Sequence, residues 1–407
     1  MTPKNNPKDI KVTLLLTLMV ALGPLSTDLY LPSLPSLTAT FDTTISRVQA
    51  TMSVFIGGFA CATVIYGPLS DRFGRRPILI GGMVVFVIGS LGCMAASSIE
   101  ALIAWRFVQA VGGCAGPVLV RAIVRDVYEK DEAARFLAYI ASAMALAPAV
   151  APMIGGWLHV LFGWRSHFVA LTILGGLFIL AVYILLRETN AQRDHSATQA
   201  RQMAHNFSHI LKTPQFLAFS LTLMFSYGAL FSFISVGSFV IIGVLGVAPD
   251  KFGYLFFFVA IGYACGGLLA GKLVRKIGIV SIIGVGISLG LTFGLLGFGL
   301  AISGVETTPA VIIPIVGVFF ACGFVLPTAT AGALTPFPQI AGTASSAIGF
   351  LQMSGGAIIG FSAGYLHNGT TTPLFAVILL SWVCAAVVYV HARMRGLIRP
   401  SDDAKTA

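Results

Sequence analysis

The chain has 407 residues, of which 57% are hydrophobic and only 10% are charged. Soluble domains carry about 25% charged residues, so this composition excludes a soluble protein and indicates a chain that crosses a membrane several times. The net charge of +10 also fits nucleic-acid binding, but the placement of the basic residues accounts for it without such a partner.

Twelve apolar segments follow one another, each long enough to cross a bilayer as a helix. We expect these helices at 12–34, 47–69, 77–97, 100–124, 133–160, 164–187, 214–246, 252–274, 278–303, 309–334, 342–366 and 373–394. One connection, Glu188 to Lys212, is long and polar and follows the sixth helix. The sequence therefore predicts a six-helix bundle at 1–187, a cytoplasmic linker at 188–213, and a second six-helix bundle with a short tail at 214–407.

Asp28 lies inside the first predicted helix, where a carboxylate costs at least about 2.5–3.5 kcal/mol and usually faces a cavity or a partner. At helical spacing its face is small or polar, with Thr13, Thr17, Ala21 and Pro24. We expect the larger apolar residues to face lipid: Leu14, Leu15, Leu18, Met19 and Leu22. The alternative is that Asp28 belongs to a loop that precedes Pro32.

Lysine and arginine placement predicts the orientation of the chain. With the N-terminus in the cytoplasm, all but four of the 25 basic residues fall on the inner side. The exceptions are Arg47, Arg165 and Lys251 outside and Arg106 within the fourth helix. Both termini are therefore expected in the cytoplasm.

The two predicted bundles carry the same spacing of glycines. Gly67–Gly74 follows the second helix and Gly271–Gly278 follows the eighth, and both segments lead into a basic turn. A parallel repeat of six helices is typical of alternating-access transporters, whose site lies between two pseudo-symmetric halves. In the first turn, Asp71 lies among arginines, where it can pair with a base or cap a helix N-terminus.

Arg106, in the fourth helix, is expected at nearly the depth of Asp28. A buried arginine needs a partner, so we expect an ion pair with Asp28 in at least one conformation; the alternative is that Arg106 extends to the outer head groups. Gln109 and Arg121 continue this face of the helix. Arg121 either lines the inner mouth of a cavity or anchors the helix at the membrane surface.

Small and kinking residues recur in the fifth helix: Pro148, Pro152, Gly155 and Gly156. Small residues allow backbones to approach closely, and prolines bend helices. We expect either a seam against the other half, serving as a hinge or an outer seal, or ordinary packing.

Several motifs carry a resemblance. The turn GPLSDRFGRRP at 67–77 resembles the signature loop of the major facilitator superfamily, and DLYLPSLP at 28–35 resembles the first-helix motif of its twelve-helix drug:proton antiporters in the Bcr/CflA (bicyclomycin and phenicol resistance) branch. RFVQAVGG at 106–113 and APAVAPMIGG at 147–156 resemble the motifs of helices four and five, with Ala110 replacing a usual glycine. The resemblance implies an all-α major-facilitator-type fold. It also implies a conformational latch of Asp71, Arg75 and Asp126 that holds the outward-facing state.

Drug contacts are expected from polar, aromatic and methionine side chains near mid-membrane, although plain packing is the alternative for each of them. The candidates are Tyr30, Gln109, Ser226, Tyr227, Tyr263, Gln352 and Met353.

The sequence thus predicts a monomeric proton-coupled exporter of small amphiphilic drugs in a bacterial inner membrane, with Asp28 and Arg106 coupling proton movement to export. The alternative is a proton-coupled symporter that imports a nutrient. A membrane-embedded enzyme is not expected, because His159 and His167 have no acidic cluster beside them. No cofactor is expected, and the six scattered cysteines suggest no metal site.

Overall fold

A computed structural model describes residues 10–128, 147–190, 207–337 and 340–398. This part of the chain contains helices and no strands. The first group of helices comprises α1 (Ile10–Asp28), η1 (Leu31–Ser33), α2 (Leu34–Thr40), α3 (Ile45–Phe73), α4 (Arg75–Ala95), α5 (Ile99–Gly113), α6 (Ala115–Val127), the helix Ala147–Phe162, and α8 (Arg165–Leu185). The second group comprises α10 (Pro214–Ser238), η2 (Phe239–Val244), α11 (Pro249–Ile302), α12 (Thr308–Leu334), α13 (Ala341–Tyr365) and α14 (Thr372–Met394).

These helices confirm eleven of the twelve predicted spans. Ten helical segments are long and apolar enough to cross a membrane, and α11 provides two spans because non-helical backbone at Gly278 interrupts it. The shorter apolar helix Ala147–Phe162 lies within the predicted fifth span. The start predicted for this helix, at 133–146, lies outside the described residues, as do most of the predicted linker and both ends of the chain.

The first span is interrupted directly after Asp28. The α-helix ends there, a short 3₁₀ helix follows from Leu31 to Ser33, and α2 completes the span. Proline within this stretch favours the interruption because it lacks a backbone N–H and cannot continue the hydrogen-bond ladder. Asp28 is nevertheless only 3% exposed, which excludes the expected alternative of a solvated loop.

The prediction of which side chains of the first helix face lipid was partly wrong. Leu14 and Leu18 are exposed, but Leu15, Met19 and Leu22 are buried. The helix packs against α5, α6 and α8, so its larger apolar side chains fill the core of the first group on more than one side.

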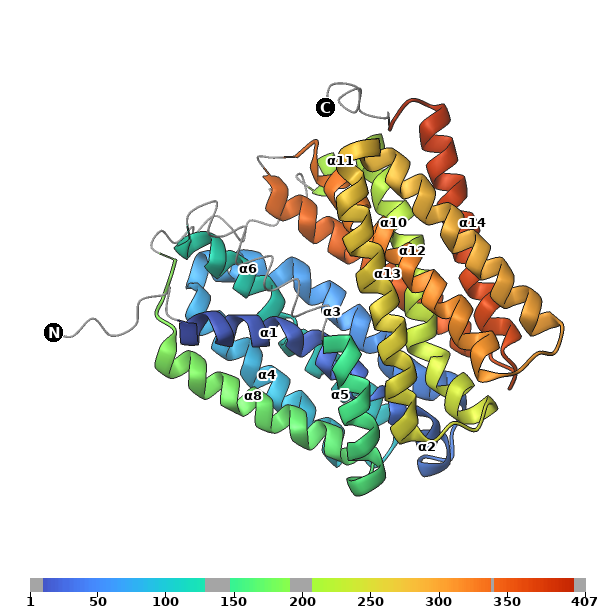
Figure 1. The fold of residues 1–407 in the computed structure, drawn as a ribbon. Helices are drawn as coiled ribbons and strands as arrows, with labels where there is room; N and C mark the ends of the chain where they lie inside the picture. Colours follow the sequence, from blue (N-terminus) through green and yellow to red (C-terminus); the bar gives the residue numbers. More distant parts are fainter. Residues whose placement is uncertain (1–9, 129–146, 191–206, 338–339, 399–407) are drawn as a thin grey trace.

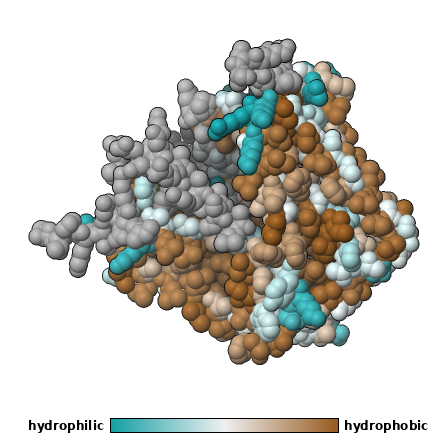
Figure 2. All heavy atoms as spheres, viewed as in Figure 1, coloured by the Kyte–Doolittle hydropathy of each residue, from teal (hydrophilic) through white to brown (hydrophobic). Residues whose placement is uncertain are grey.

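The two groups of helices lie beside each other, and α3 packs along α13 between them (Figure 1). The segment η1 contacts α10 and α11, and α2 contacts η2. We call the end of the molecule that carries Arg72, Arg75 and Arg76 the basic end, and the opposite end the α2 end. Hydrophobic side chains dominate the visible face of both groups (Figure 2), as expected of a surface in contact with lipid.

The two glycine turns adopt the same backbone conformation. Gly74 has φ 104° and ψ 153°, and Gly278 has φ 77° and ψ 161°. Such positive φ values are readily available only to glycine. The repeated spacing in the sequence therefore corresponds to a repeated bend in the structure.

Candidate functional site

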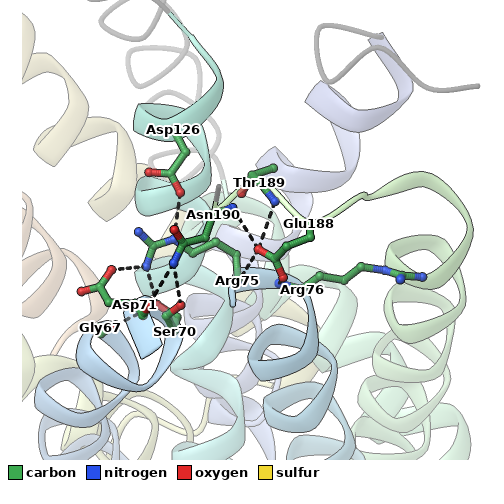
Figure 3. A network of polar contacts seen from close by, with 9 residues as sticks. All are labelled: Gly67, Ser70, Asp71, Arg75, Arg76, Asp126, Glu188, Thr189 and Asn190. Atoms are coloured by element: carbon green, nitrogen blue, oxygen red, sulfur yellow. Dashed lines mark hydrogen bonds and ion pairs between the residues drawn. The ribbon is translucent and has the colours of Figure 1, made fainter. Parts of the chain in front are cut away.

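The structure brings together the three residues of the expected latch at the basic end (Figure 3). Arg75, at the start of α4, donates from Nε to Asp126 on α6 at 2.8 Å and from Nη1 to Asp71 on α3 at 2.5 Å. Its Nη1 also donates to the Ser70 hydroxyl at 2.6 Å. The Arg75 side chain is 5% exposed, and its hydrogen bonds join three helices of the first group.

Glu188 completes this network, and the sequence had placed it only in the polar linker. Its Oε1 accepts the backbone N–H of Arg75 at 2.9 Å, and its Oε2 accepts that of Arg76 at 3.3 Å. The expected capping role of Asp71 therefore belongs to Glu188, because Asp71 is engaged by the Arg75 side chain. The sequence did contain a signal for this contact. Glu188 is an acid at the end of the sixth predicted helix, on the same side of the bundle as the start of α4, and a helix N-terminus attracts negative charge.

Arg106 lies in the core of the first group. Its Nη1 donates to the Ser26 carbonyl oxygen at 3.0 Å and to Gln109 Oε1 at 2.7 Å. Its guanidinium also lies 4.2 Å from the ring centre of Phe55 and 5.0 Å from that of Tyr30. Aromatic faces attract a desolvated cation, so backbone, amide and ring contacts together accommodate the buried charge.

Asp28 and Arg106 do not form the expected ion pair in this structure. The Asp28 carboxylate accepts a hydrogen bond from the Thr27 hydroxyl at 2.9 Å, while Arg106 reaches the backbone two residues earlier. The segment η1, which follows Asp28, contacts α10 and α11 of the second group. The interruption of the first span thus lies where the first group of helices meets the second.

Gly155 and Gly156 lie at two close backbone contacts. A Cβ at Gly155 would collide with the Leu29 carbonyl, immediately after Asp28, and one at Gly156 would collide with the Pro249 carbonyl at the start of α11. Gly253 of α11 is equally close to Met153. The fifth-helix motif therefore packs against both the interruption of the first span and the second group of helices.

The seven candidate drug contacts fall into two sets. Three are completely buried, and their polar atoms already have partners: Tyr30 with Thr51, Gln109 with Arg106 and Ser90, and Ser226 with the Thr222 carbonyl. The other four are partly exposed: Tyr227, Tyr263, Gln352 and Met353. Only the second set presents side-chain surface in this structure.

His159 and His167 meet at one hydroxyl group near the α2 end. Ser33 Oγ lies 2.8 Å from His159 Nδ1 and 2.5 Å from His167 Nε2. No cluster of three or more potential metal ligands (His, Cys, Asp or Glu) occurs among the described residues. The contact joins η1 to α8 and to the helix Ala147–Phe162.

Comparisons with known proteins agree with this architecture. A model of the Major Facilitator Superfamily matches residues 16–360. The chain is 30% identical to a bicyclomycin resistance protein homolog of Haemophilus influenzae, covering 94% of this chain and 96% of the relative. It is 27% identical to multidrug resistance protein D of Escherichia coli (94% and 98%) and 30% identical to a chloramphenicol resistance protein of Pseudomonas aeruginosa (85% and 81%).

Solved structures show the same fold at low sequence identity. A bacterial homolog of the human lysosomal transporter Spinster superposes with a TM-score of 0.74 at 16% identity, covering 96% of this chain and 98% of that one. A D-xylose-proton symporter superposes with a TM-score of 0.69 at 17% identity, covering 97% and 98%.

Proposed function

Because the chain belongs to the Major Facilitator Superfamily, whose members are transporters rather than enzymes, we propose that it exports small amphiphilic drugs in exchange for protons. The relatives named for bicyclomycin, chloramphenicol and multidrug resistance support this substrate class. The observation that carries the proposal is the position of Asp28. It is a buried carboxylate at the interruption of a membrane span, just before η1, which contacts α10 and α11 of the other group of helices.

Asp28 is the proton carrier in this scheme. The proton affinity of a carboxylate depends on its burial and on nearby charges, and both change when the two groups of helices move apart. A drug that binds between the two groups of helices and a proton that binds Asp28 change the populations of the same two conformations. Export against a gradient then follows from the different affinities of proton and drug for the two states.

Four partly exposed side chains are the proposed drug contacts: Tyr227, Tyr263, Gln352 and Met353. Aromatic and methionine surfaces adapt to apolar ligands of different shape. The basic end faces the cytoplasm of a bacterial cell, with both termini on that side, in agreement with the positive-inside rule. The transporter works as a monomer in the inner membrane and needs no cofactor beyond the proton gradient.

The latch of Asp71, Arg75 and Asp126 holds the basic end closed in the outward-facing state. Gly155 and Gly156 form the seam that closes the α2 end in the opposite state. Each cycle therefore exchanges one set of contacts for the other.

Proteoliposomes that contain purified protein test the proton carrier. Asp28→Asn should bind drug and exchange it across the membrane but lose uphill export driven by a pH gradient. The control is Asp42→Asn, an exposed acid whose left-handed backbone (φ 47°) asparagine tolerates. Full gradient-driven export by Asp28→Asn would exclude Asp28 as the carrier, and drug uptake together with protons would identify a symporter.

A further inference from the structure

We propose that Ser33, His159 and His167 form a second proton-binding site, separate from Asp28, and that a proton bound there favours the conformation with an open α2 end. The inference goes beyond the proposed function, because it requires neither proton binding by Asp28 nor the export of a drug. It starts from one hydroxyl group that lies between two imidazole rings.

The Ser33 hydroxyl bridges these rings by hydrogen bonds. Its Oγ lies 2.8 Å from His159 Nδ1 and 2.5 Å from His167 Nε2, and the two ring centres are 6.5 Å apart. A hydroxyl group carries one proton and two lone pairs. Two neutral imidazoles therefore satisfy it, because one ring nitrogen donates to Oγ and the other accepts the hydroxyl proton.

The direction of the two hydrogen bonds follows from the burial of His167. This ring is completely buried, and its other nitrogen, Nδ1, has no hydrogen-bond partner among the described residues. Buried N–H groups without an acceptor are rarer than buried acceptors without a donor, so His167 carries its proton on Nε2 and donates it to Ser33. Ser33 then donates to His159 Nδ1, which is the basic atom of the bridge. His159 is also partly exposed.

A proton bound at His159 Nδ1 disrupts this pattern. Both ring nitrogens that face Ser33 are then donors, and the hydroxyl proton loses its acceptor, since Ser33 Oγ has no third partner in the described part of the chain. The imidazolium also needs water or a counter-ion, because an unpaired buried charge is unfavourable. The bridge therefore binds a proton poorly while it is enclosed and more readily once water reaches it.

The charged groups around the bridge do not supply a counter-ion in this conformation. Arg106 and Arg165 donate to backbone carbonyl oxygens, and Glu100 pairs with Arg47. Within the described residues, no carboxylate forms an ion pair with either imidazole, so an imidazolium there depends on water. The titratable or charged residues on the neighbouring elements are Asp28, Tyr30, Asp42, Arg47, Glu100, Arg106, Arg165, Asp250 and Lys251.

Both sides of the bridge pack against the second group of helices. Ser33 ends η1, a completely buried segment that contacts α10 and α11. His159 follows Gly156 by one helical turn, and a Cβ at Gly156 would collide with the Pro249 carbonyl at the start of α11. When the α2 end opens, the second group leaves both elements and water gains access to them. Proton binding at the bridge and opening of the α2 end therefore favour each other.

Spin-label distances in nanodiscs, without drug or a pH gradient, test this site. Labels on exposed Ser97, after α4, and exposed Val305, after α11, report the separation of the two groups at the α2 end in a cysteine-free background. Between pH 7.5 and pH 5.5, across the ordinary titration range of histidine, the ratio of open to closed α2 end should rise by about fivefold or more, as is usual for two coupled sites. The same rise is expected in Asp28→Asn, which removes the other proposed proton site.

His159→Asn should abolish the rise, because its amide oxygen can accept from Ser33 near the position of Nδ1 but takes up no proton in this range. Ser33→Ala should raise the open ratio at pH 7.5 and flatten its pH dependence. The matched control is His367→Gln, which changes a partly buried histidine in the loop after α13 and should keep the full rise.

A full rise in His159→Asn would overturn the proposal, as would the absence of a rise in the unmodified protein. Loss of the rise in Asp28→Asn would assign the response to Asp28 instead, and an equal loss in His367→Gln would show that it is not specific to the bridge. If Ser33→Ala fails to fold, His159→Asn still decides the question. None of these outcomes depends on whether the protein exports drugs.

Discussion

Arg106 donates a hydrogen bond to the Ser26 carbonyl oxygen at 3.0 Å and so holds the last turn of α1 two residues before Asp28. This contact fixes the helix where the first span is interrupted. The buried arginine therefore positions the segment that carries the carboxylate, without neutralising the carboxylate in this conformation.

Arg106→Lys should destabilise the protein by about 2 kcal/mol or more. A lysine cannot reproduce the planar donor set that reaches Ser26 and Gln109, and it leaves buried acceptors unsatisfied. The matched control is Arg165→Lys, because exposed Arg165 also donates to two carbonyls and lies over an aromatic ring. Thermal unfolding in detergent measures both, and an equal loss in the two variants would contradict the positional role of Arg106.

Gly156→Ala should separate the two groups of helices at the α2 end. The added methyl group would collide with the Pro249 carbonyl, so the seam must open or the helices must shift. Gly176→Ala on α8 is the control, because no atom lies within 4 Å of its Cβ position. The distance between spin labels on exposed Phe162 and Val305 should be longer for Gly156→Ala only. An unchanged distance would show that the contact at Gly156 does not hold the α2 end closed.

Gly74→Ala should cost about 1–3 kcal/mol, because alanine is strained at a φ of 104° and its methyl group displaces Glu188. Gly67→Ala, at the other end of the same motif, meets no atom within 4 Å and should be neutral or slightly stabilising in its helix. Melting temperatures of the two variants check this difference. Equal values would mean that the bend tolerates alanine.

His367 should contribute to a decline in folding stability as the pH falls. Burial lowers the pKa of His367, in the loop after α13, below its ordinary value of 6.5. The unfolded chain therefore binds a proton as the pH falls through about 6.5, whereas the folded chain binds it only at lower pH, so stability declines on acidification. His367→Gln should reduce the loss of melting temperature between pH 7.5 and pH 5.5, whereas exposed His391→Gln should not. An unchanged pH dependence in His367→Gln would exclude this contribution.

The sequence predicted the helices well because apolar length alone specifies a membrane span. The latch residues could also be placed at one end of the bundle, since Asp71, Arg75 and Asp126 lie at helix ends on the basic side. Similar depth suggested an ion pair between Asp28 and Arg106, but depth does not give the rotation of each helix about its axis. The hydrogen bond of Arg106 to Ser26 and its aromatic contacts depend on that rotation.

Glu188 was missed for a related reason. A polar segment after a membrane helix has the composition of a solvated connection, and composition does not reveal that one carboxylate reaches the first backbone amides of α4. That contact depends on the positive φ of Gly74 and on α8 ending beside α4. Both are tertiary features.

The repeated glycine bend has a consequence for how such a chain diversifies. Gly74 and Gly278 share a backbone conformation, but only the first copy carries the acids and the arginine of the latch. The bend is thus common to both groups of helices, whereas the acid–arginine network belongs to the first alone. The proposed drug contacts Tyr227, Tyr263 and Gln352 lie on α10, α11 and α13 of the second group, so substitutions there leave the residues of that network in place.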